Sequence, residues 1–309
     1  MKTEARGAAA ERPDTPLSAA TATAQDRANG YTLMTTSAAA NQIGASLGAM
    51  AFPVIGPVGV VSIRQVFAAL FLPPIARPRF WRFTRSQWLP ILGLALALSV
   101  MNLTLYASID RIGLGLAVTL EFLGPLGVAV AGSRRLIDLL CALLAGAGVV
   151  VLTNPGPSTD VLGVTFGLIA ACAWAAYILL NRTLGQRLPG IEGTTTASMI
   201  AACAWIPIGV WWFSAHPPTL AAILLALGCG LGSSNVPYVT DLQALRRVSA
   251  QVFGTFTSIN PVFAALAGLL FLGQALQLNE WIGMAIIVAA NVIVSARSFR
   301  ASKVNEPVL

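Results

Sequence analysis

Charged residues and metal ligands are scarce in this sequence of 309 residues. Only 10% of the residues are charged, whereas soluble domains carry about 25%. There is one histidine, His216, and the four cysteines are widely spaced, which excludes a metal centre and a disulfide framework. With one candidate acid in the spans and no histidine beside it, the chain lacks the paired groups that an intramembrane enzyme needs. The sequence therefore predicts neither catalysis nor a cofactor.

Apolar residues are in excess. Hydrophobic residues make up 56% of the chain and the mean hydropathy is +0.75, which is typical of a membrane protein. Lipid offers the backbone no hydrogen-bond partner and nothing alternates like a barrel strand, so the fold class is an all-α membrane protein. Windows of about 20 residues predict ten transmembrane helices, at Leu33–Pro53, Pro57–Ala76, Trp88–Ala107, Ile112–Gly132, Ile137–Leu152, Val161–Leu180, Thr195–Phe213, Leu220–Tyr238, Val248–Leu272 and Trp281–Ala296.

Basic residues orient these spans. Of the 19 Lys and Arg residues, 17 fall in the two tails or in loops on the same side as the tails. The positive-inside rule then places both termini in the cytoplasm. The net charge of +7 is explained by anionic lipid at one face and does not indicate nucleic-acid binding. Residues 1–31 and 298–309 are polar and are expected to be disordered cytoplasmic tails.

Two parts of the chain align with one another. Arg111–Leu126 (RIGLGLAVTLEFLGPL) lies over Arg247–Val262 (RVSAQVFGTFTSINPV) at a constant offset that pairs Pro125 with Pro261. This indicates a tandem duplication of five spans, and because five is odd the two copies have inverted topology. A chance alignment of two apolar sequences is the alternative. The predicted repeats comprise residues 32–154 and 155–297.

Glu121 is the most informative residue of the chain. It lies in the middle of an apolar span, where an ionisable side chain is costly and marks a substrate or proton path. Pro125, four residues later, is expected on the same helix face, where it frees a carbonyl at the depth of the carboxylate. A structural hydrogen bond between helices is the alternative reading of Glu121. Arg64 is the other charge within a span, and it either reaches outward to the headgroups or binds a substrate carboxylate.

Further polar residues lie within the spans. We expect them to line a hydrated cavity together with Glu121, whereas the alternative for each is a hydrogen bond to a neighbouring helix. The candidate residues of the substrate and proton pathway are Asn41, Gln42, Arg64, Asn102, Glu121, Pro125, Ser234, Asn235, Tyr238, Gln251, Thr255, Ser258 and Asn260.

Three segments resemble a known family. Asn41–Gly59, Ala107–Val130 and Val252–Gln274 resemble the EamA-type drug/metabolite transporter superfamily, and the motifs EFLGPL, FGTFTS and Pro237–Tyr238 resemble its threonine/homoserine exporter branch. The resemblance implies export of small amino acids across the inner membrane, with protons as the coupling ion. Its partners are then a small-molecule substrate, protons and the lipid bilayer, and both a monomer and a homodimer are open. The alternatives are export of other amphiphilic compounds or cations, a channel, and a non-transporting scaffold.

Overall fold

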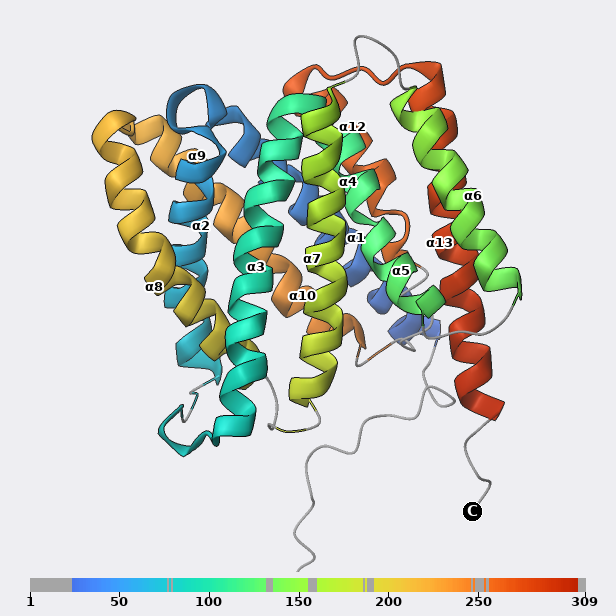
Figure 1. The fold of residues 1–309 in the computed structure, drawn as a ribbon, viewed down its shortest axis with the longest axis horizontal. Helices are drawn as coiled ribbons and strands as arrows, with labels where there is room; N and C mark the ends of the chain where they lie inside the picture. Colours follow the sequence, from blue (N-terminus) through green and yellow to red (C-terminus); the bar gives the residue numbers. More distant parts are fainter. Residues whose placement is uncertain are drawn as a thin grey trace, which may run out of the picture.

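The computed structural model describes residues 24–76, 78, 80–131, 136–154, 160–185, 187, 192–245, 247, 253 and 256–304. All regular structure in these ranges is helical, and the helices form one bundle (Figure 1). The predicted all-α class is confirmed for this part of the chain. The longer helices are α1 (Ala24–Met50), α2 (Phe52–Ala76), α3 (Arg85–Ile112), α6 (Leu136–Thr153), α7 (Val161–Gly185), α8 (Glu192–Ala215) and α13 (Leu278–Val304), and a 3-10 turn, η1, spans Phe80–Arg82.

The described helices have the apolar composition of membrane spans. Four stretches are both long and apolar enough to cross a bilayer, namely Phe52–Phe71, Arg85–Ile112, Val161–Leu184 and Glu192–Ala215. Shorter apolar stretches occupy five further positions that the sequence predicts as spans. Large apolar side chains on the outside of the bundle, such as Leu89, Leu270 and Val210, are at least 70% exposed. This surface suits hydrocarbon as its solvent.

Two of the predicted spans are interrupted. The first is split into α4 (Leu114–Glu121) and α5 (Leu123–Ala131). Pro125 has no N–H to donate to the carbonyl of Glu121, four residues earlier, so the helical ladder breaks there. The second interrupted span contains α9 (Leu220–Gly230), the π-helix η2 (Leu231–Asn235) and α10 (Val236–Leu245).

The predicted span Val248–Leu272 is described only in part. Its regular helix, α12 (Asn260–Leu272), follows a turn at Ser258 and Ile259 and has Pro261 in its first turn. A proline at this position fits a helix start, because its missing N–H is one that a helix terminus leaves unpaired in any case.

Both tail predictions are wrong at their inner edges. α1 begins at Ala24, inside the predicted tail of residues 1–31, and α13 continues to Val304, inside the predicted tail of residues 298–309. The tails were predicted from low hydropathy, but hydropathy reports where a helix leaves lipid and not where it ends. Alanine, arginine and glutamine at these ends favour helix in water.

Helices that are far apart in the sequence pack side by side. α3 packs along α7, α1 along α10 and η2, α2 along α8, and α6 along α13. Figure 1 shows the pairs α3 with α7 and α6 with α13. α4 packs against α12 and α7. The short helix that carries Glu121 is therefore enclosed by other helices.

Several described helix ends next to basic residues lie at one end of the bundle. In Figure 1, α2 ends, α3 begins, α7 ends and α13 ends toward the bottom of the view. The predicted sidedness of these loops is therefore consistent with the fold. Which face of the membrane this end meets stays a prediction.

Candidate functional site

Arg64 lies on α2, and its guanidinium is surrounded by polar groups of α3 and η2. Nη1 donates to Oδ1 of Asn102 at 2.6 Å and to the hydroxyl of Tyr106 at 3.3 Å. Nε donates to Oγ of Ser234 at 3.2 Å, and Nη2 donates to the carbonyl oxygen of Ser233 at 3.3 Å. Of the two readings left open by the sequence, outward snorkelling is therefore wrong. The side chain points into the bundle.

The acceptors around Arg64 are all uncharged. No carboxylate oxygen in the described part of the chain lies within 4.0 Å of its guanidinium nitrogens. Glu121 attracts Arg64 electrostatically across a larger separation. A buried cation without a directly bound anion is unfavourable unless other groups or a ligand compensate it.

α3 orients two of these acceptors. Asn102 and Tyr106 are four residues apart, so they share one helix face. The amide Nδ2 of Asn102 donates to the carbonyl of Leu98 at 2.8 Å, which leaves Oδ1 to face Arg64. The Tyr106 hydroxyl is hydrogen-bonded to Sγ of Cys229, 2.9 Å away, and its ring meets Phe52 edge-on at 5.8 Å. Tyr106 was missed by the sequence analysis, although its spacing from Asn102 is a usable signal.

Glu121 is the last residue of α4 and is 7% exposed. Among the described residues its carboxylate has no hydrogen-bond donor, and the charge of Arg64 is its electrostatic partner. The ring of Phe122, the next residue, packs edge-on against Trp174 with centroids 4.8 Å apart. The residues before and after Glu121, Leu120 and Phe122, are both buried. Its functional role stays a prediction.

Pro125 is not on the same helix as Glu121. The two residues lie on α5 and α4, on either side of the break at Phe122. Phe122 between them keeps helical backbone angles (φ −65°, ψ −10°), so a shared face of Glu121 and Pro125 stays a prediction. The carbonyl freed by Pro125 is that of Glu121 itself, as expected from the missing N–H.

α1 brings Asn41 and Gln42 against the π-helix. The carbonyl oxygen of Asn41 accepts a hydrogen bond from Oγ of Ser233 at 2.8 Å. A Cβ at Gly44 would lie 2.5 Å from the backbone nitrogen of Ser233, so the two helices can approach this closely only at a glycine. Gln42 is 2% exposed. The segment that supplies two contacts to Arg64 is thereby fixed to α1.

Several buried polar atoms have no hydrogen-bond partner in the described part of the bundle. They are both amide atoms of Asn235, Nε2 of Gln65 and Oδ1 of Asn260. Asn235 is only 2% exposed and ends the π-helix. An unpaired buried polar atom costs about 1–3 kcal/mol, so water or a ligand is needed to satisfy it. Gln65 was not identified from the sequence.

Four more residues of the predicted pathway lie in or near the parts of the chain that the structure does not describe in full. Ser258 is 4% exposed and precedes α12. Gln251 and Thr255 lie outside the described residues, as does the side chain of Tyr238.

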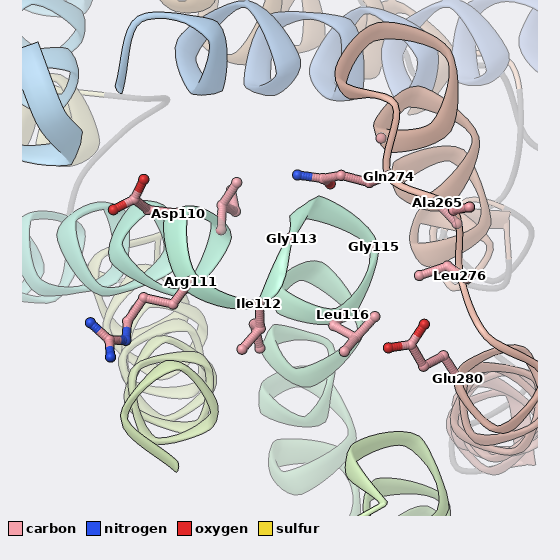
Figure 2. Close-up of a pocket in the computed structure, with 13 residues that line it drawn as sticks. Asp110, Arg111, Ile112, Gly113, Gly115, Leu116, Ala265, Gln274, Leu276 and Glu280 are labelled. Carbon is pink, nitrogen blue, oxygen red and sulfur yellow. The ribbon is translucent and has the colours of Figure 1, made fainter. Parts of the chain in front are cut away.

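A pocket of about 300 Å³ opens at the other end of α4 (Figure 2). The carboxylates of Asp110 and Glu280 and the amide of Gln274 lie around it, and Oε1 of Gln274 accepts from the backbone N–H of Leu114 at 2.9 Å. α4 runs from this pocket to Glu121, a distance of about 10 Å at 1.5 Å per residue. The pocket and Glu121 therefore lie at opposite ends of one short helix.

Arg111, beside the pocket, makes an ion pair with Asp160. Its Nε lies 3.0 Å from Oδ2 of Asp160, while Oδ1 accepts the backbone N–H of Gly163 at 2.8 Å. The backbone hydrogen bond from Gly163, followed by the side chain of Arg111, lowers the pKa of the Asp160 carboxyl. This pair joins the end of α3 to the start of α7.

No group of three His, Cys, Asp or Glu side chains that could hold a metal ion is present among the described residues.

Comparisons with known proteins agree with the sequence motifs. The EamA-like transporter family matches residues 161–296. The threonine/homoserine exporter RhtA of Salmonella typhimurium is 36% identical over 264 residues, which cover 81% of this chain and 86% of that protein. The protein of the same name in Escherichia coli K12 is 35% identical over 86% of this chain and 90% of its own length.

The chain belongs to the EamA-like transporter family. The uncharacterized transporter YvbV of Bacillus subtilis is 24% identical over 78% of this chain and 83% of its own length. One protein of known crystal structure shares the fold with a TM-score of 0.58 at 17% identity, over 91% of this chain and 99% of that one. The family resemblance predicted from the three motif segments is confirmed, and the curated relatives named above are called exporters or transporters.

Proposed function

We propose that this EamA-family protein exports small amino acids, threonine and homoserine among them, in exchange for protons. The observation that carries the proposal is the pair of opposite charges in the interior, Arg64 and Glu121, which attract one another without a direct ion pair. A zwitterion is the kind of solute that such a pair suits. The RhtA relatives, which are named as threonine/homoserine exporters, support the same substrate class.

Glu121 is the group that exchanges substrate for protons in this proposal. A carboxyl group can hold a proton or pair with an ammonium group, but it cannot do both at once. Proton binding on one side of the membrane therefore displaces the amino acid, and proton release on the other side restores the carboxylate for the next substrate. The result is antiport.

Alternating access is proposed to arise from two inverted repeats. The aligned segments support this, because the helix break at Phe122 and the turn at Ser258 fall at equivalent positions. The packing is also consistent with two repeats. In the proposed repeats α1 corresponds to α7, and α3 corresponds to the span that contains α10, so the contact of α3 with α7 has its equivalent in the contact of α10 with α1. Exchanging the two repeats maps the pairs α2 with α8, α4 with α12 and α6 with α13 onto themselves.

A transport assay tests the proposal. The full-length protein is purified, reconstituted into liposomes loaded with unlabelled threonine, and assayed for uptake of labelled threonine by counterflow. A pH gradient is then imposed to measure proton-driven transport. We expect Glu121→Gln to abolish pH-driven transport while the protein keeps its size-exclusion profile.

Glu192→Gln provides the matched control, since Glu192 is in the first turn of α8 and is not among the described hydrogen-bond partners of Arg64. This variant is expected to transport like the wild type. Retained pH-driven transport in Glu121→Gln would remove Glu121 from the coupling mechanism. Lack of threonine or homoserine exchange by the wild type would overturn the substrate assignment.

A further inference from the structure

The hydroxyl of Ser234 differs from several other hydroxyl groups inside the bundle. Ser46, Ser62 and Ser99 each donate to the backbone carbonyl four residues earlier, at 2.8–2.9 Å. Thr104 and Thr119 do the same. Ser234 Oγ instead accepts a hydrogen bond from Nε of Arg64, and among the described residues its own O–H has no acceptor.

The π-helix explains why Ser234 is available. In a π-helix the turn is wider than in an α-helix and the usual ladder is shifted, a feature that is frequent at functional sites. Within Leu231–Asn235, the carbonyl of Ser233 accepts from Arg64, and the side chain of Ser233 is occupied by the Asn41 carbonyl. Ser234 and Asn235 follow with unused donors, and Asn235 is 2% exposed with both amide atoms unpaired.

Arg64 also keeps a donor. A guanidinium has five N–H groups, and the hydrogen bonds to Ser234, Asn102, Tyr106 and Ser233 use four of them. One N–H of Nη2 remains. Among the described residues this N–H has no hydrogen-bond acceptor.

The unused N–H of Arg64, the hydroxyl of Ser234 and the positive charge of Arg64 all favour an anionic ligand that accepts hydrogen bonds. Two donors from a guanidinium and a neighbouring hydroxyl match the two oxygens of a carboxylate. The guanidinium has no carboxylate within 4.0 Å in the described part of the chain, so a ligand carboxylate would supply its missing anion. Glu121, the nearby opposite charge, is then free to pair with a cation.

We infer that Arg64 and Ser234 bind the α-carboxylate of the substrate while Glu121 binds its α-ammonium group. This inference rests on the proposed amino-acid export and assigns the two ends of the substrate to named residues. The protein requires both charged groups of its substrate. An amino alcohol lacks the carboxylate that Arg64 binds in this proposal. An N-acetyl amino acid lacks the ammonium group that Glu121 binds.

Competition in the counterflow assay tests the inference. Unlabelled threonine, its amino alcohol and its N-acetyl derivative are compared as inhibitors of labelled threonine uptake by the full-length protein in liposomes. For the wild type we expect each analogue to inhibit at least about tenfold more weakly than threonine, since each loses a charged hydrogen bond.

Two variants separate a binding role from a structural one. Arg64→Gln should weaken inhibition by threonine about 10- to 100-fold and leave inhibition by the amino alcohol unchanged, so that the preference for threonine is lost. Ser234→Ala keeps the charge and should lower the same preference by a smaller factor. Arg182→Gln changes an exposed residue at the end of α7. This variant should leave the inhibition by threonine and the inhibition by the amino alcohol at the wild-type level.

The outcomes are distinct. No exchange of threonine or homoserine by the wild type overturns the proposed function. Exchange by the wild type with equal inhibition by threonine and its amino alcohol leaves that function intact and overturns the inference. An equal loss for both inhibitors in Arg64→Gln or Ser234→Ala also overturns it. If Arg64→Gln does not fold, Ser234→Ala and the wild-type comparison still decide.

Discussion

Nη1 of Arg64 donates a 2.6 Å hydrogen bond to Oδ1 of Asn102 and so joins α2 to α3 inside the bundle. Replacing Asn102 by leucine removes this acceptor and leaves part of a charged group unpaired. We expect a loss of about 1–3 kcal/mol in the free energy of unfolding, measured by detergent-induced unfolding. Ser99→Ala is the control, because that hydroxyl bonds only to its own helix at Ala95. An Asn102→Leu variant as stable as Ser99→Ala would contradict the prediction.

The carboxyl of Asp160 should make stability depend on pH. Its folded-state pKa is lowered by the backbone N–H of Gly163 and by Arg111, so its contribution is present above the unfolded-state pKa of about 3.9 and is lost as the pH falls through the folded-state pKa. Asp160→Asn keeps a capping oxygen and removes the charge.

Thermal unfolding of the two proteins in mild detergent over a pH series checks this. The variant should be less stable than the wild type at neutral pH, and the two should converge in the acid range. A difference that is constant with pH would contradict the assignment.

The close approach of α1 to the π-helix predicts a strict requirement for glycine at position 44. A Cβ there would lie 2.5 Å from the backbone nitrogen of Ser233 and 2.8 Å from the carbonyl carbon of Gly232, and the backbone can yield only by moving a helix. Gly44→Ala should cost about 1–3 kcal/mol and reduce transport. Gly146→Ala on α6 is the matched control, since nothing lies within 4 Å of its Cβ position. Equal melting temperatures for the two variants would refute the prediction.

Trp212 stabilises the kink in α2. Its indole Nε1 donates at 2.7 Å to the carbonyl of Ile55, next to Gly56, whose φ of 63° interrupts the helix. Trp212→Phe removes the donor and should lower stability by about 1 kcal/mol. The neighbouring Trp211 is 71% exposed, so Trp211→Phe should be neutral. Thermal unfolding with equal effects at the two positions would show that the hydrogen bond contributes nothing.

Topology can be tested by cysteine labelling in a background without the four native cysteines. Cysteines at positions 85 and 182 should both be protected from an impermeant maleimide in intact cells, whereas a cysteine at position 110 should react. This pattern follows from cytoplasmic termini and an even number of spans. Labelling of position 85 but not of position 182 would show that the proposed arrangement is wrong.

The extent of the spans was predictable because it depends on local composition. A stretch of about 20 apolar residues has to be helical in lipid whatever surrounds it. The break after Glu121 was also within reach, since Pro125 lacks the N–H that would continue the helix. The π-helix was not, because nothing in the letters LGSSN distinguishes a π-turn from an α-turn.

The sequence by itself thus determined an apolar helical bundle with two internal charges and the family to which the chain belongs, and it predicts the sidedness of the basic loops. Only the tertiary structure decided which polar groups meet. Arg64 is 38 residues from Asn102 and 170 residues from Ser234 along the chain, and such contacts depend on how helices pack rather than on any local preference. The helix faces that meet are selected by close approaches such as that of Gly44 to Ser233, which no single segment encodes.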